Sequence, residues 1–207
     1  APLITAIGAS IVLQQIAMMI WSRNPLAFPQ ILPNPVFAIA GATITAVQIA
    51  IIAASIMMMV GLTLIVYRTR LGVAMRATSQ NPHVAGLMGV DINYVIAATF
   101  VLGAALAAVA GVMVGTYYGI AHYTMGSLLG LKAFAAAVLG GIGNLAGAML
   151  GGMLLGIVEA LGAGYIGDLT NNVFGSNYQD VFAFMVLIAV LVFRPSGLLG
   201  ERVGERA

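Results

Sequence analysis

Two residues of this 207-residue chain, Lys132 and Glu159, place an ionisable group well inside long apolar segments. A charge in such a segment is expensive, and it usually marks a functional site or a buried ion pair. Lys132 lies 12 residues before Asn144, and Glu159 lies 15 residues after it. At a rise of about 1.5 Å per residue, the two groups differ in depth by about 4–5 Å if the segments form a hairpin. We expect them to pair or to share a hydrated cavity on a transport path, unless Lys132 extends outward to the membrane surface.

The remaining residue types offer little for catalysis. The chain has no cysteine, which excludes disulfides, thiol nucleophiles and thiolate metal sites. His83 lies in a basic loop and His122 in an aromatic turn, and both are expected to be ordinary interface residues and not metal ligands. No nucleophile–base arrangement and no phosphate-binding loop occurs in the sequence. The sequence therefore predicts a protein that is not an enzyme and that uses no metal and no cofactor.

The composition indicates what kind of element carries these groups. Of all residues 61% are hydrophobic and only 7% are charged, whereas soluble domains carry about 25% charged residues. Several uncharged runs approach the roughly 20 residues that a helix needs to cross a bilayer. The net charge of +2 is too small to suggest a nucleic-acid partner. We therefore predict an all-α fold, a polytopic transmembrane helical bundle.

About six membrane-crossing segments are predicted: residues 3–21, 40–67, 92–116, 126–143, 145–164 and 181–193. The second segment is longer than a span requires, so either its first residues are irregular or the helix is tilted. Asp91 is the expected N-cap of the third segment. The connections are a proline-rich loop at 22–35, a basic loop at 68–93, an aromatic turn at 117–124 and a polar loop at 168–180.

Positive charges orient the bundle, because loops with an excess of Lys and Arg remain in the cytoplasm. Six of the eight basic residues gather in the basic loop or near the C-terminal end: Arg68, Arg70, Arg76, Arg194, Arg202 and Arg206. An even number of crossings must separate the two groups, which requires a chain reversal at residues 140–144. This reversal is predicted near the cytoplasmic side. The loops at 22–38 and 165–180 are predicted outside, with Arg23 as the exception.

Small residues recur at four-residue spacing along two predicted helices. One stripe contains Gly103, Ala107, Gly111 and Gly115, and the other contains Gly143, Gly147 and Gly151, with Gly152 and Gly156 beside it. Small residues let helix backbones approach closely inside a membrane. The stripes indicate either tight packing within one rigid bundle or a face that slides during transport. Gly140 and Gly141 are expected in the hinge between the two helices.

The basic loop contains the signals of a short helix. Asn81 is a suitable N-cap and Pro82 a suitable first helical residue, and Gly89 is placed to end the helix. One apolar face then contains Val84, Leu87 and Met88. Such a helix beside three arginines either lies on anionic lipid or inserts into a groove of a cytoplasmic partner.

Three blocks of the sequence resemble a known family. RTRLGVAMRATSQNPHVAGLMGVDIN, GLKAFAAAVLGGIGNLAGAMLGG and FRPSGLLG, in this order and spacing, are similar to the LivH-type permease subunit of bacterial high-affinity branched-chain amino-acid ABC importers. The resemblance covers nearly the whole chain and implies one transmembrane permease domain over residues 1–207. In that family further transmembrane helices precede the point where this chain starts, so an N-terminal part is expected to be missing.

The resemblance also implies partners and a role for the basic loop. It implies a second related permease subunit, two cytoplasmic ATP-binding subunits, membrane lipid around the bundle, and a periplasmic binding protein that delivers leucine, isoleucine or valine to the bacterial inner membrane. The loop at 68–93 is then the coupling segment, and residues 81–89 rest on an ATPase. The positions assigned to coupling are Arg76, Ala77, Asn81, Pro82, Ala85, Leu87 and Gly89. The resemblance assigns no substrate-binding residue.

Other functions remain open on the residues alone. A permease of the same superfamily for a sugar, a nucleoside or urea is the nearest rival. An ATP-independent channel or secondary transporter would need an ion-coupling cluster, for which Lys132 and Glu159 are the available groups. An intramembrane enzyme lacks a catalytic set. Gln48 and Thr99 either supply polar groups to a mostly apolar path or form hydrogen bonds between helices.

Overall fold

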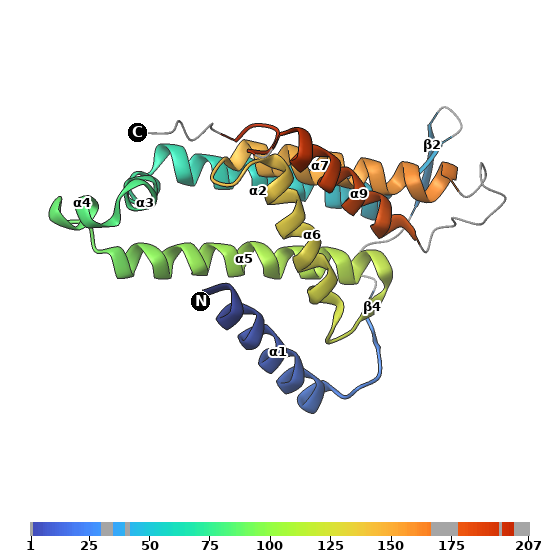
Figure 1. Ribbon diagram of the computed structural model, residues 1–207. Coiled ribbons are helices and arrows are strands. Elements are labelled where there is room, and N and C mark those ends of the chain that lie inside the picture. Colours follow the sequence, from blue (N-terminus) through green and yellow to red (C-terminus); the bar gives the residue numbers. More distant parts are fainter. Residues whose placement is uncertain (1, 30–34, 40–41, 167–177, 195, 201–207) are drawn as a thin grey trace. The chain divides into compact units, whose positions relative to one another are not determined.

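Figure 1 shows a computed structural model of the chain, which describes residues 2–29, 35–39, 42–166, 178–194 and 196–200. The described part is mostly helical and forms two compact units, residues 1–124 and 125–207. Four helices are long and apolar enough to cross a membrane, and two shorter apolar helices accompany them. This confirms the predicted polytopic helical class, although two of the six predicted segments are short. Most of the predicted loop at 168–180, together with Arg202 and Arg206, lies outside the described residues.

Three long helices dominate the first unit: α1 (Pro2–Trp21), α2 (Ala46–Arg68) and α5 (Ile92–Tyr118). Most of their large apolar side chains are exposed, which is typical of helices that face lipid or neighbouring helices. Asp91 caps α5 as predicted, because its Oδ1 accepts hydrogen bonds from the backbone N–H groups of Asn93 and Tyr94, at 3.0 and 3.2 Å. These bonds satisfy donors that the first turn of a helix leaves open.

The second predicted segment begins as a β-hairpin and not as helix. Strand β2 (Val36–Ile39) pairs antiparallel with β3 (Ala42–Thr45), so α2 starts at Ala46. Thr45 and Gln48 fix this start as a capping box: the Gln48 N–H donates to Thr45 Oγ1 at 3.3 Å, and the Thr45 N–H donates to Gln48 Oε1 at 3.0 Å. The described residues at the start of the predicted segment, before α2, are therefore in a strand. This agrees with the expectation that the first residues of so long a segment are not regular helix.

The proline-rich loop after α1 packs against the end of α5. Strand β1 (Leu26–Ala27) pairs with β4 (Ile120–Ala121), and the Phe28 N–H donates to the Gly119 C=O at 2.9 Å. The Phe28 ring covers Gly115, where an added Cβ would lie 3.0 Å from a ring carbon. The described residues of this loop, 22–29 and 35, are not helical, as its prolines predict.

The basic loop folds into two helices, α3 (Arg70–Gln80) and α4 (Pro82–Leu87), which join α2 to α5 (Figure 1). Helix α4 is predicted by the sequence, whereas the expectation of a loop at the position of α3 is wrong. Thr69 separates α2 from α3: its Oγ1 donates to the Ile65 C=O at 2.6 Å and accepts from the Gly72 N–H at 3.1 Å. The residues that follow are mostly good helix formers, so α3 forms despite its charges.

The second unit is a hairpin of α6 (Met125–Gly140) and α7 (Leu145–Leu161), with α9 (Gln179–Phe193) packed along it. In Figure 1 α9 is the red helix beside the orange α7. Helix α7 continues into a π-helical turn, η1 (Gly162–Ile166). A small apolar core joins the three helices and contains Ala135, Leu139, Leu155 and Ala183, of which Leu139 is fully buried.

Close backbone approach holds the α6–α7 hairpin together. A Cβ added at Gly140, Gly147 or Gly151 would overlap the backbone of the facing helix, so only glycine fits these positions. The chain reverses through Gly141 and Gly143, which have φ angles of 111° and 93° in the region that favours glycine. The predicted reversal at residues 140–144 is confirmed.

The segment after α9 covers this reversal. The N–H groups of Leu198 and Leu199 donate to the C=O groups of Leu139 and Gly140, at 2.9 and 3.0 Å. The side-chain amide of Asn144 donates to the Leu199 C=O at 2.8 Å. These bonds satisfy carbonyl groups that the end of α6 leaves open, and they bring residues 196–200 against the glycine-rich turn.

Candidate functional site

Three charged side chains meet in the second unit. Lys132 Nζ lies 3.0 Å from Glu159 Oε2 and 2.7 Å from Asp180 Oδ1. The side chains of Lys132 and Glu159 are each 18% exposed, and that of Asp180 is 33% exposed. The structure thus brings together the two residues singled out in the sequence, and it adds Asp180. We call these three residues the charged cluster.

Helical spacing explains why Lys132 and Glu159 meet. On α6, Lys132 precedes Ala136 by four residues, and Gly140 follows four residues later. On α7, Glu159 follows Gly151 by eight residues, on the same face. The small residues on these faces of α6 and α7 pack backbone to backbone, so Lys132 and Glu159, farther along the same faces, lie opposite each other. The close packing of the two helices therefore positions the ion pair.

Asp180 was assigned to a polar loop by the sequence, although it lies in the first turn of α9. A carboxylate is favoured there by the positive end of the helix dipole. Ala183, three residues later on the same face, is 3% exposed in the core of the unit. The packing of Ala183 therefore turns Asp180 toward the same interior. The spacing of Asp180 and Ala183 is the signal in the sequence that identifies this face.

The charged cluster carries one positive and two negative charges. Glu159 uses Oε2 to bind Lys132, and its Oε1 is buried without a hydrogen-bond partner among the described residues. A buried carboxylate oxygen without a partner is unfavourable by about 1–3 kcal/mol or more. The cluster therefore has more acceptor capacity than its single ammonium group satisfies.

The short helix α4 has the ends that the sequence predicts. Asn81 Oδ1 accepts from the Val84 N–H at 3.2 Å, and Pro82 is the first helical residue. At the other end Gly89 has φ +85°, and the N–H of Val90 donates to the Ala85 C=O at 3.1 Å. This is a Schellman arrangement, which ends the helix sharply.

Helix α4 presents an apolar face that no described residue covers. Leu87 is 75% exposed and Met88 is 81% exposed, and Val84 beside them is half exposed. Ala85, on the opposite side, is 4% exposed. The helix is thus attached to its own unit through Ala85 and offers its larger apolar side chains outward.

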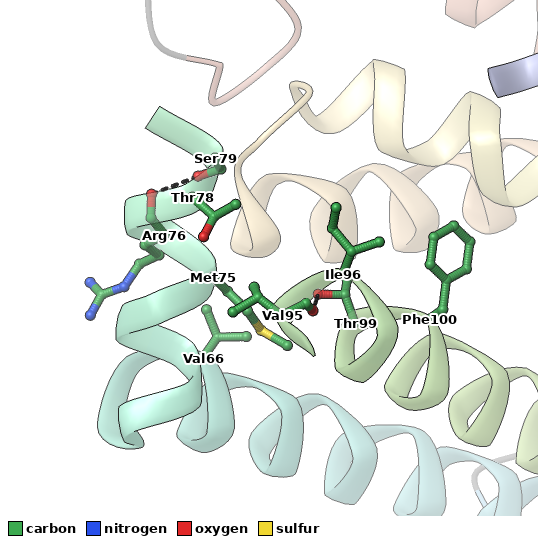
Figure 2. A pocket seen from close by; sticks show the side chains of 9 residues that line it. All are labelled: Val66, Met75, Arg76, Thr78, Ser79, Val95, Ile96, Thr99 and Phe100. Atoms are coloured by element: carbon green, nitrogen blue, oxygen red, sulfur yellow. Dashed lines mark hydrogen bonds between the residues drawn. The ribbon is translucent and has the colours of Figure 1, made fainter. Parts of the chain in front are cut away.

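Helix α3 supports this segment and borders a cavity. The cavity has a volume of about 450 Å³ and lies between α2, α3 and α5 (Figure 2). The Arg76 guanidinium lies 5.3 Å from the centre of the Tyr67 ring, close enough for a cation–π interaction. Ala77, the neighbouring position assigned to coupling, is partly buried in α3. The cavity is lined by Val66, Met75, Arg76, Thr78, Ser79, Val95, Ile96, Thr99 and Phe100.

The glycine stripe on α5 differs from that on α7. A Cβ added at Gly103 or Gly111 would meet no described atom within 4 Å, whereas Gly115 is covered by Phe28. In the described part of the first unit, tight packing along this stripe is therefore limited to Gly115. Gly103 and Gly111 therefore form a strip of small residues on α5 that no described residue covers.

Gln48 and Thr99 make local hydrogen bonds. Gln48 belongs to the cap of α2, and Thr99 Oγ1 donates to the Val95 C=O of its own helix at 2.8 Å. Among the described residues neither side chain forms a hydrogen bond to another long helix, because each finds a partner within its own helix or its cap. His122 Nδ1 lies 2.7 Å from Thr124 Oγ1, in the turn after α5.

Comparison with known proteins identifies related sequences. The chain matches the family described as branched-chain amino acid transport system / permease component over residues 1–191. It is 49% identical over 209 residues to the high-affinity branched-chain amino acid transport system permease protein BraD of Pseudomonas aeruginosa, covering 99% of this chain and 66% of that protein. It is 41% identical over 209 residues to the corresponding LivH protein of Escherichia coli K12, covering 99% of this chain and 65% of that protein.

A more distant relative is the probable branched-chain amino acid transport permease protein LivH of Methanocaldococcus jannaschii, 34% identical over 148 residues, covering 70% of this chain and 45% of that protein. The chain spans about 65% of the length of the two most similar relatives given above. No solved structure matches it.

Proposed function

Because the chain belongs to the family of branched-chain amino acid transport system permease components, we propose that it forms the membrane-spanning part of an ATP-driven importer of leucine, isoleucine and valine. The observation that carries this proposal is the 49% identity to a permease of that kind along 99% of the chain. Helices of the right length and hydropathy support the membrane location, which we assign to the bacterial inner membrane.

The proposed partners follow from the same assignment. They are a second related permease subunit, two cytoplasmic ATP-binding subunits that hydrolyse ATP, and a periplasmic binding protein that delivers the amino acid. The whole chain, residues 1–207, acts in this proposal as one permease domain. The many exposed apolar side chains of its long helices support contact with lipid and with further helices.

Helix α4 is the proposed contact with an ATP-binding subunit. Three features support this role: the exposed apolar face around Leu87, the sharp caps at Asn81 and Gly89, and the attachment through buried Ala85. A short helix with fixed ends transmits displacement as a rigid body, whereas a flexible loop absorbs it. ATP binding shifts the permease between two states only if the contact at α4 differs between those states.

The α6–α7 hairpin is proposed to move as one rigid body during this change. Gly140, Gly147 and Gly151 support this view, because their backbones are too close for the helices to slide without separating. Gly141 and Gly143 form the turn that fixes the angle between the two helices. Gly103 and Gly111 on α5 are proposed to pack against a further helix of the complete importer, where small residues permit close contact.

The test is ATP-dependent uptake of leucine into proteoliposomes that contain the complete permease with its partner subunits. Leu87→Asp places a charge on the exposed face of α4 and is expected to reduce uptake at least tenfold while the membrane subunits still assemble. The matched control is Val73→Asp, which places the same charge at an exposed apolar position of α3. Uptake in the control is expected to remain within about twofold of the wild type.

Three results would each contradict a part of the proposal. Leucine uptake that continues without the ATP-binding subunits would make the protein a channel or a secondary transporter. ATP-driven uptake of a sugar, a nucleoside or urea in preference to leucine would keep the importer mechanism and reject the substrate. Equal loss of uptake in both aspartate variants would reject α4 as the specific contact.

A further inference from the structure

The charged cluster of Lys132, Glu159 and Asp180 is not electrically balanced. It contains two carboxylates and one ammonium group, inside a unit whose helices are otherwise apolar. Arg194, the other basic residue described in this unit, follows Asp180 by 14 residues, so it lies about 20 Å along α9 from the cluster. Among the described residues, the cluster therefore has one more negative than positive charge.

The position of Glu159 points to where a further positive charge would bind. Glu159 lies in the last turn of α7, two positions before Leu161, and the helical backbone continues through η1 to Ile166. Its Oε1 is buried and has no hydrogen-bond partner among the described residues. Asp180 Oδ1 is likewise buried and makes no hydrogen bond among the described residues, although it lies 2.7 Å from Lys132 Nζ. Glu159 Oε1 and Asp180 Oδ1 are thus the acceptors of the cluster that a further donor would satisfy.

The chemistry of these acceptors favours an ammonium group with several N–H donors. Resting on the proposed function, we infer that Glu159 and Asp180 bind the primary ammonium group of the transported amino acid, while Lys132 holds the two carboxylates in place. Binding gives two positive and two negative charges and supplies a donor to Glu159 Oε1. Asp180 is one-third exposed, which makes it the most accessible of the three side chains. The α-carboxylate of the substrate binds outside this cluster.

This inference predicts which part of leucine the permease recognises. Radiolabelled leucine is bound to the complete permease with its ATP-binding subunits in nanodiscs, in the absence of the periplasmic binding protein. Two competitors are compared: 3-methylbutylamine, which retains the ammonium group, and 4-methylpentanoate, which retains the carboxylate and lacks the ammonium group. The amine is expected to displace leucine at least tenfold more effectively than the acid. Equal competition by the two compounds, or stronger competition by the acid, overturns the inference.

Variants locate the site within the protein. Glu159→Gln retains the size of the side chain and removes its charge, and it is expected to weaken leucine binding about tenfold or more. Asp180→Asn leaves the Lys132–Glu159 pair intact and is expected to reduce competition by the amine. The matched control is Asp91→Asn, which removes a carboxylate from the other unit and retains an oxygen for the cap of α5.

A purely structural cluster gives a different result. If Glu159→Gln assembles and binds leucine within twofold of the wild type, the inference is wrong. If that variant does not assemble, the comparison of the amine with the acid on the wild-type protein decides whether the inference holds. Wild-type nanodiscs that bind no leucine also overturn the inference, whereas ATP-driven leucine uptake by the same subunits would still support the proposed function. The two proposals can therefore fail separately.

Discussion

At the scale of single residues, the charged cluster depends on the Lys132 ammonium group, which contacts carboxylates of α7 and α9. Lys132 and Glu159 stand out because charges are rare in apolar helices, and their distances from the turn predict similar depth. The sequence does not identify Asp180 as a member of the cluster, because its partner Lys132 lies on α6 and their contact depends on the packing of α9. A carboxylate beside a polar loop is not marked by the rarity of charge, so its spacing from Ala183 is the remaining signal in the sequence.

Removing the single cation of the cluster should destabilise the protein. Lys132→Met leaves the carboxylates of Glu159 and Asp180 facing each other in an apolar unit, which is expected to lower stability by about 3 kcal/mol. The measurement is thermal unfolding of the purified complex, with Arg70→Met as a control at an exposed cation. The triple variant Lys132→Met, Glu159→Gln, Asp180→Asn should recover part of the loss. A triple variant less stable than Lys132→Met alone would show that like-charge repulsion is not the cause.

At the scale of elements, the sequence predicts where helices begin and end better than it predicts which segments are helical. The caps at Asn81, Gly89 and Asp91 depend on local backbone chemistry, which the sequence states directly. Helix α3 and the β2–β3 hairpin are not identified by the sequence, because charge near the membrane suggests a loop and apolar β-branched residues suit strand and helix equally. Thr69 and Thr45 decide both cases through side-chain hydrogen bonds with the helix ends.

Glycines with the same spacing should respond oppositely to alanine. Gly151→Ala places a Cβ into the backbone of α6 and is expected to destabilise the protein by about 1–3 kcal/mol. Gly103→Ala meets no described atom on α5, so in this chain alone, without the further helix proposed to pack there, it is expected to be neutral or stabilising by up to about 1 kcal/mol. The comparison is made by thermal unfolding of the two variants in the same detergent. Equal destabilisation would mean that Gly103 is covered in the complete protein, as close packing against a further helix requires.

The caps of α4 should matter for transport more than for overall stability. Asn81→Ala removes the acceptor of the Val84 N–H and is expected to weaken the helix by about 1 kcal/mol. Amide hydrogen exchange within α4 should then accelerate, while exchange in α5 stays unchanged. Asn81→Asp retains a capping oxygen and serves as the control. Faster exchange throughout the first unit would indicate that α4 stabilises the whole unit, and it would contradict the view that α4 is an independently folded contact helix.

At the scale of the whole molecule, the blocks that carry the family resemblance acquire a structural meaning. The glycine-rich block forms the α6–α7 reversal, and the block after α9 binds the same reversal through Leu198 and Leu199. The sequence analysis recognises both blocks separately, but their contact joins residues about 55 positions apart and has no local signal. The predicted orientation rests on a different kind of information, the distribution of arginine, which acts during insertion and not through contacts.

This orientation can be tested on the complete permease, because the chain contains no cysteine that would react in the background. Leu87→Cys lies on the exposed face of α4 and should react with a membrane-impermeant maleimide only in inside-out vesicles. Asn24→Cys lies in the exposed loop after α1 and should react in intact cells whose outer membrane has been permeabilised. Any native cysteine elsewhere in the complete subunit is first replaced by serine. Labelling of both positions from one side would place α4 and the loop on the same face. An even number of crossings would then separate the two positions. If both were labelled from the outer side, α4 could not be the contact with a cytoplasmic subunit.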